Sequence, residues 1–70
     1  MMTFGKWLND WIFQRDMSQR DLAKAIGISQ SSISSHISGK RRPSFRSVKR
    51  YCDFFGEFDV YGVYELVLMA

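Results

Sequence analysis

Residues 18–43, SQRDLAKAIGISQSSISSHISGKRRP, constrain the fold of this chain more than any other stretch of it. A serine at the start of an apolar pattern is typical of a helix N-cap, and Gly27 then interrupts that pattern. A second serine opens a further run with isoleucines four residues apart, and Gly39 follows that run. The stretch therefore predicts two short helices, at 19–26 and 30–38, joined by a tight turn.

Two short helices linked by a glycine-containing turn of three or four residues describe a helix-turn-helix. In this motif the second helix enters the major groove of DNA. The sequence therefore predicts a DNA-binding element with its helix 30–38 as the recognition helix.

The same stretch resembles the Cro and phage-repressor helix-turn-helix family, also called XRE-type or lambda-repressor-like domains. The positions in register are Ser18, Gln19, Leu22, Ala23, Gly27, Ile28, Ser29, Gln30, Ile33, Ser34, Gly39 and Pro43. The resemblance implies an all-α, compact domain of four to five helices over residues 1–70, with the helix-turn-helix at about 18–39. Because the chain is short, it resembles the small Cro-like proteins of phage lysogeny switches more than two-domain repressors.

Outside this stretch, apolar spacing predicts a first helix over about Phe4 to Arg15 and a fourth over about Ser44 to Phe54. Thr3 and Ser44 are the expected caps of these helices. The first helix has its apolar stripe at Phe4, Leu8, Trp11 and Ile12, with Trp7 off its centre and Phe13 opposite it. The fourth has its stripe at Phe45, Val48, Tyr51, Cys52 and Phe55.

The tail, residues 57–70, is ambiguous between two kinds of structure. Asp59 could cap a fifth helix, with its apolar face at Val60, Val63, Tyr64, Val67 and Leu68. The β-branched and aromatic residues of 60–64 also suit a strand, and Gly62 would cost a helix about 1 kcal/mol relative to alanine. We expect a short helix. The alternative that residues 57–70 form an interface with another protein is not excluded by the sequence.

Composition excludes several classes of protein. Seventy residues suit a single domain, and a hydrophobic content of 46% is too high for a disordered chain. The sequence has no apolar run of membrane-spanning length and no secretory signal at its start. Cys52 and His36 are the only residues of their types, so no disulfide, zinc site or Cys–His catalytic pair is expected. We expect a cytoplasmic protein that is not an enzyme and takes no cofactor or small-molecule ligand.

Charge is distributed unevenly along the chain. Residues 40–50 hold six basic residues and no acidic one, whereas residues 51–70 hold four acidic residues and no basic one. The basic block directly follows the expected recognition helix. Such a block is typical of a surface that contacts phosphates.

On the recognition helix, Ile33 and Ile37 are expected to face the core, which leaves a polar face for bases. A glutamine can grip adenine through two hydrogen bonds, so Gln30 is the first candidate for base recognition. Serine hydroxyls bond to several bases and add weaker contacts, some through water. The expected base-contacting residues are Gln30, Ser31, Ser34 and Ser35. His36 is expected to be structural.

Contacts to the DNA backbone are expected on both sides of the recognition helix. Gln19 lies at the N-terminus of the first helix of the motif, where backbone N–H groups favour an anion. The expected backbone-contacting residues are Gln19, Ser38, Lys40, Arg41, Arg42 and Arg46.

These features predict a transcriptional regulator that binds a double-stranded DNA operator, as a homodimer because one motif makes few base contacts. A different function also fits: an antirepressor or modulator that binds a second regulator protein through apolar surface. The apolar tail and the aromatic residues of the first helix motivate this alternative. Loss of partner binding without loss of DNA binding on truncation of the tail would favour it.

Overall fold

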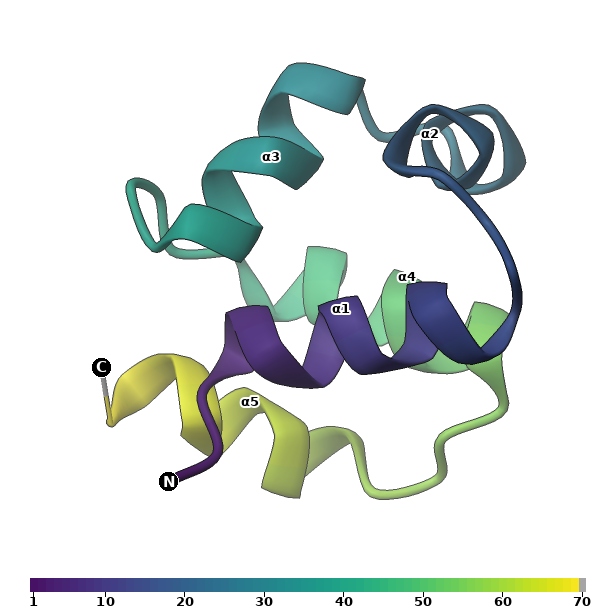
Figure 1. Ribbon diagram of the computed structural model, residues 1–70. Coiled ribbons are helices and arrows are strands. Elements are labelled where there is room, and N and C mark those ends of the chain that lie inside the picture. The colour runs from purple at the N-terminus through teal and green to yellow at the C-terminus, as the bar shows by residue number, and fades with distance from the viewer. Residues whose placement is uncertain (70) are drawn as a thin grey trace.

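The computed structural model describes residues 1–69, which form five helices and no strand. The helices are α1 (Phe4–Gln14), α2 (Gln19–Ile26), α3 (Gln30–Ser38), α4 (Phe45–Phe55) and α5 (Val60–Leu68), as Figure 1 shows. The predicted all-α fold is confirmed, and the bounds of α2 and α3 are those predicted. The first helix ends one residue earlier than expected, and the fourth extends one residue further, to Phe55.

Local side chains determine where the helices begin and end. Each helix begins after a cap whose side-chain oxygen accepts the backbone N–H three residues further on; the caps are Thr3, Ser18, Ser29, Ser44 and Asp59. Three helices end at glycines in the left-handed conformation: Gly27, Gly39 and Gly56, with φ of 72°, 83° and 79°. This backbone conformation is strained for any residue with a Cβ atom, so glycine ends these helices at little cost.

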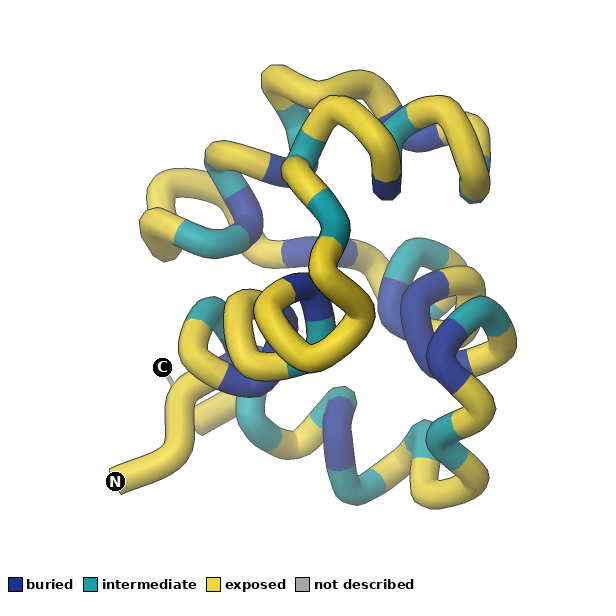
Figure 2. Tube along the Cα trace, turned by 45° about the vertical axis from the view of Figure 1, so that its right-hand side comes forward, coloured by how far each residue is buried: buried dark blue, intermediate teal, exposed yellow. Residues whose placement is uncertain are grey.

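The helices surround one apolar core. In Figure 1, α2 and α3 lie on one side of the molecule, α5 lies on the opposite side, and α1 and α4 run between them. Figure 2 shows that the buried segments of the helices turn toward this interior. The side chains with no exposed surface are Leu8, Leu22, Ile33, Val48, Tyr51 and Cys52. The core therefore holds the helix-turn-helix and the remaining helices together.

The two tryptophans of α1 differ from what periodicity suggested. Trp7 is buried, with 8% of its surface exposed, between the rings of Phe4 and Phe55. Trp11, predicted on the central stripe, is only partly buried and stacks on Phe55 with 5.1 Å between ring centroids. Arg15 covers this stack and donates a 3.0 Å hydrogen bond to the Phe55 carbonyl oxygen. The aromatic side of α1 is therefore core, except for Phe13, which is 85% exposed.

The tail forms the helix that we expected, and the strand alternative is wrong for it. Val63 and Val67 are buried, and the Asp59 carboxylate accepts the Gly62 N–H at 3.0 Å. Leu68, predicted on the buried face, is instead 56% exposed because the core contacts of α5 are made by Val63 and Val67. The face of α5 that packs on α1 and α4 is therefore narrower than the apolar pattern of the sequence.

Cys52 is a core residue, as expected. Burial, with the nearby carboxylates Glu57, Asp53 and Asp59, raises the pKa of its thiol to about 11. The thiol therefore stays protonated at neutral pH. Within residues 1–69, no helix has the length and apolar character needed to cross a bilayer, and His, Cys, Asp and Glu form no group of three that could hold a metal ion.

Candidate nucleic-acid interface

The outer face of α3 is polar and carries the residues predicted to contact bases. Gln30, Ser31 and Ser34 are exposed, and Ser35 is partly buried. Their side chains are short except for that of Gln30, which lies at the first position of the helix. The structure therefore brings all four residues together on one helix, with Gln30 as the only side chain among them that could grip both polar atoms of an adenine edge.

Hydrogen bonding separates Ser32 from this face. The Ser29 hydroxyl donates to the Ser32 hydroxyl at 2.9 Å and accepts the Ser32 backbone N–H at 3.1 Å. Both hydroxyls are therefore engaged in capping α3. This agrees with the sequence interpretation, which left Ser32 out of the base contacts.

The inner face of α3 is anchored by one apolar and one polar contact. Ile33 is fully buried, and the His36 ring and the Tyr51 hydroxyl share a 2.8 Å hydrogen bond at His36 Nδ1. The two rings meet edge to face with centroids 5.9 Å apart. Because Tyr51 lies on α4, this bond links the inner face of α3 to α4. His36 is structural, as predicted, and Tyr51 is a positioning residue that sequence reasoning missed.

The signal for this pair was present in the sequence. A buried tyrosine normally finds a hydrogen-bond partner for its hydroxyl. Tyr51 lies on the apolar stripe of its helix, and the chain has a single histidine, which was expected to be structural. Pairing them would have required knowing that α3 and α4 pack at this point, which neither helix pattern reveals.

We expect His36 to make folding stability dependent on pH. Burial, and then the positive charge of Arg41, lowers the pKa of His36 below its usual value. Below about pH 6.5 the unfolded chain then binds more protons than the folded one, so the free energy of unfolding falls as pH decreases toward the folded-state pKa. The slope from this single group is at most about 1.4 kcal/mol per pH unit. Urea denaturation between pH 7.5 and 5.5 measures it.

The control for this prediction is His36→Gln, which keeps a polar side chain and removes the titration. It should be less stable than the parent at pH 7.5 and should show a flatter pH dependence over the same range. An equal slope in both proteins would assign the pH dependence to other groups.

The connection after α3 folds back onto the end of that helix. The Ser35 carbonyl oxygen accepts the Ser38 hydroxyl at 3.2 Å and the Arg41 backbone N–H at 3.3 Å. The Ser38 oxygen in turn lies 3.4 Å from the Lys40 backbone N–H, which donates to it. The hydroxyl proton of Ser38 is therefore used within the chain, whereas the basic side chains that follow it are exposed.

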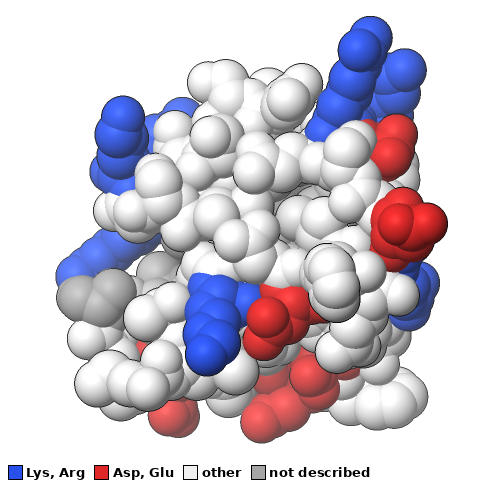
Figure 3. Space-filling view, in the orientation of Figure 1, with Lys and Arg blue, Asp and Glu red and all other residues white. Residues whose placement is uncertain are grey.

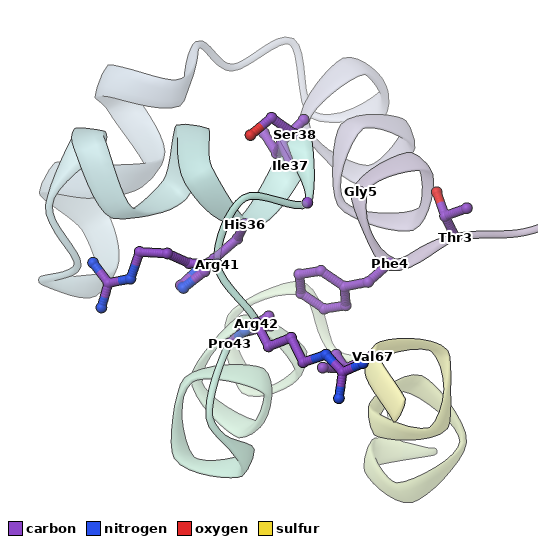
Figure 4. Close-up of a pocket in the computed structure, with 11 residues that line it drawn as sticks. Thr3, Phe4, Gly5, His36, Ile37, Ser38, Arg41, Arg42, Pro43 and Val67 are labelled. Carbon is purple, nitrogen blue, oxygen red and sulfur yellow. The ribbon is translucent and has the colours of Figure 1, made fainter. Parts of the chain in front are cut away.

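The Lys and Arg side chains of the segment 40–50 do not all lie on one surface. Figure 3 shows Lys and Arg side chains along the edge of the molecule beside α3 and the α3–α4 connection and again beside α2, and acidic side chains both beside α2 and along the edge beneath α5. In Figure 4, Arg41 and Arg42 extend in opposite directions from this connection, Arg42 toward Val67 of α5. Lys40 and Arg46 are exposed. The structure therefore separates Arg42 from Arg41, which the sequence could not do.

The N-terminus of α2 already holds a carboxylate. Ser18 and Asp21 form a capping box, in which Asp21 accepts the Ser18 N–H at 3.0 Å and Ser18 accepts the Asp21 N–H at 3.0 Å. The bond from the Ser18 backbone lowers the pKa of the Asp21 carboxyl. The cap predicted at Ser18 is confirmed. Gln19, next to it, is partly buried, so any phosphate bound there would share the helix end with Asp21.

One comparison with known proteins places the chain in a family. A protein-family model described as helix-turn-helix matches residues 12–60, which is more than half of the chain. The matched region begins within α1, includes α2 to α4 and ends at the first residue of α5. No curated protein and no solved structure matches the chain significantly.

Proposed function

The chain belongs to the helix-turn-helix family of the Cro and phage-repressor type and is thus a DNA-binding transcription regulator, and we propose that it is a sequence-specific, Cro-like repressor. In this proposal, α3 enters the major groove of an operator, and the protein acts in the bacterial cytoplasm on phage or bacterial DNA. The observation that carries the proposal is the polar outer face of α3, held in place from within by Ile33 and the His36–Tyr51 bond.

Base recognition is assigned to the exposed face of α3. Gln30 is the main specificity residue, and Ser31, Ser34 and Ser35 add weaker contacts. One glutamine and three serines let each copy of the protein discriminate only modestly between DNA sequences. We therefore propose that two copies bind a palindromic operator as a homodimer, which doubles the contacts.

Backbone contacts are assigned to the surface around this helix. Lys40, Arg41 and Arg46 are exposed and supply positive charge after α3. Gln19, Ser38 and Arg42 are further proposed contacts. Ser38 uses its hydroxyl proton within the chain, and Arg42 points toward α5. Gln19 shares its helix end with the Asp21 carboxylate.

The test is a gel shift of random-sequence duplex DNA with the purified protein, followed by sequencing of the bound DNA. A salt concentration of about 0.1 M is suitable, because phosphate contacts still contribute strongly to binding there. Enrichment of a short palindrome is the expected result and gives the half-site spacing. A bound pool that stayed random in sequence would reject sequence-specific binding.

We expect Gln30→Ala to weaken operator binding by about 1–3 kcal/mol and to relax selection at one base position in each half-site. The physical reason is the loss of a paired donor and acceptor at the start of the recognition helix. Gln14→Ala is the matched control, because Gln14 is also exposed but lies at the end of α1. Fluorescence anisotropy with the selected operator measures both. An unchanged footprint for Gln30→Ala would contradict the assignment of this helix face.

A second candidate function is supported by exposed aromatic side chains away from α3. Phe13, Phe58 and Tyr61 are 85%, 97% and 74% exposed. A regulator that binds another protein, as an antirepressor or modulator does, could use them as anchors. A random pool in the selection experiment would make this function the leading one.

A further inference from the structure

The basic side chains of α2 lie on its outer face. Arg20 and Lys24 are both exposed, and they are the two basic residues of this helix. They lie four residues apart, which places them on the same side of a helix. Leu22, midway between them in sequence, is fully buried and faces the core. The two cations therefore extend outward from the domain.

The charges of Arg20 and Lys24 are only partly compensated within the domain. Neither residue forms an ion pair with any of residues 1–69. Asp21 is the one acidic residue of α2, and its carboxylate accepts the Ser18 N–H at 3.0 Å in the capping box. The bonds with Ser18, and then the two positive charges, lower the pKa of the Asp21 carboxyl. Like charges four residues apart repel each other on a helix, and an anion bound between them would relieve this repulsion.

The surface between α2 and the basic connection after α3 carries no charge. It includes the outer face of α3, with Gln30, Ser31, Ser34 and Ser35. Figure 3 shows Lys and Arg side chains on either side of an uncharged surface, beside α2 on one side and beside α3 and the α3–α4 connection on the other. The turn 27–29 joins α2 to the start of α3, and the basic residues 40–42 follow its end. Positive charge therefore lies at both ends of α3.

This arrangement matches the phosphates that border a major groove. A helix of nine residues is about 13 Å long, and the major groove is about 12 Å wide, with the phosphates of one strand along each edge. We propose that Arg20 and Lys24 bind phosphates of one DNA strand while the basic side chains after α3 bind phosphates of the other. This inference rests on the function proposed above. It assigns to α2 two phosphate contacts besides Gln19.

Contacts at both edges of the groove would orient the domain on DNA. Phosphate contacts set the register and orientation of a protein on a duplex, whereas base contacts provide specificity. Contacts along one edge alone would let the domain roll about that strand. A second row of contacts, made by Arg20 and Lys24, would therefore hold the short serine side chains of α3 against the bases.

Salt dependence measures the contribution of the two residues. Each phosphate contact adds about 0.9 to the slope of log K against log salt, so the double substitution Arg20→Ala with Lys24→Ala should flatten this slope by about 1.8. Operator binding at about 0.1 M salt should weaken about 10- to 100-fold. Alanine favours a helix, so circular dichroism of the variant should match that of the parent.

The comparison variant removes the same charge from other helices. Lys6 and Lys49 are exposed residues of α1 and α4 for which no DNA contact is proposed. Replacing both by alanine should change the slope and the affinity little. Equal effects of the two double substitutions would assign the loss to net charge and reject the proposal.

Ethylation interference on the selected operator identifies the strand that each group contacts. Ethylation removes the charge of a phosphate, and with the parent it should weaken binding at phosphates on both strands of each half-site. With Arg20→Ala and Lys24→Ala, interference should disappear on one strand and persist on the other. Replacement of Lys40, Arg41 and Arg46 by alanine should give the reverse pattern. An unchanged pattern in the α2 variant, or loss on the same strand in both variants, would overturn the proposal.

The parent protein separates a failure of this proposal from a failure of the proposed function. A parent that binds duplex DNA without sequence selection rejects sequence-specific repression, and its salt dependence on random duplex still tests Arg20 and Lys24. A parent that selects an operator, with the same slope and interference in the α2 variant, rejects only the contacts of α2. A parent that binds no duplex rejects both.

Discussion

Gly5→Ala is expected to destabilise the domain by about 3 kcal/mol or more, a large part of the 4–10 kcal/mol typical of about 70 residues. A Cβ atom at Gly5 would overlap the Ile37 carbonyl oxygen and lie 3.0 Å from the Ile37 carbonyl carbon. Both are backbone atoms and cannot rotate away, so α1 and α3 would have to move apart. Thermal and urea denaturation followed by circular dichroism measure the loss, which corresponds to at least about 12 °C in Tm.

The sign of this effect is informative, because helix propensity alone predicts the opposite. Alanine favours a helix interior over glycine by about 1 kcal/mol. Gly62→Ala is the matched control, since there the three atoms nearest to the new Cβ belong to the carboxylate of the capping residue Asp59 and not to the backbone. Loss of that cap and gain in propensity are each about 1 kcal/mol and should nearly cancel. If Gly5→Ala proved as stable as Gly62→Ala, the close approach of α1 and α3 would be wrong.

Combined replacement of Lys40, Arg41 and Arg46 by alanine is expected to reduce operator affinity by about two to three orders of magnitude at about 0.1 M salt. Each phosphate contact contributes about 0.9 to the slope of log K against log salt, so the slope should flatten by about 2.7. Affinity for non-specific duplex should fall by a similar factor, because phosphate contacts carry little sequence information. Anisotropy titrations over a range of salt concentrations measure both quantities.

The control for this prediction removes the same charge from elsewhere. Lys6, Lys49 and Arg50 are exposed residues for which no DNA contact is proposed, and replacing all three by alanine also lowers the net charge by three. This variant should lose little affinity and keep most of its salt dependence. Equal losses in the two triple variants would mean that net charge, and not the surface beside α3, governs binding.

The sequence was sufficient to predict the first four helices and the motif. Caps such as Ser29 act on backbone groups three residues away, and glycines such as Gly39 end helices through their own backbone conformation. These effects operate within one helical turn, so a linear pattern reveals them. The helix-turn-helix needed no more than these signals and the apolar spacing between them.

The candidate site was predicted only in part. The exposure of Gln30, Ser31 and Ser34 followed from the burial of Ile33 on the opposite side of a short helix. Tyr51 was missed as the partner of His36 because its contact crosses from α3 to α4, 15 residues away along the chain. The DNA contacts themselves stay predictions, because they depend on a partner that the sequence only implies.

Tertiary packing decided which member of an apolar pattern is buried and where long side chains point. Trp7 is buried more deeply than Trp11. Leu68 is exposed and Val67 is buried, although the sequence placed both on the same apolar helix face. Arg41 and Arg42 are adjacent and alike in sequence, yet they extend to opposite sides of the chain. Burial and side-chain direction depend on segments that meet only after folding, whereas capping and helix termination depend on near neighbours. The sequence by itself therefore determined the first four helices and their motif, and only the tertiary structure decided between helix and strand for the tail, the anchor of α3 and the surfaces around it.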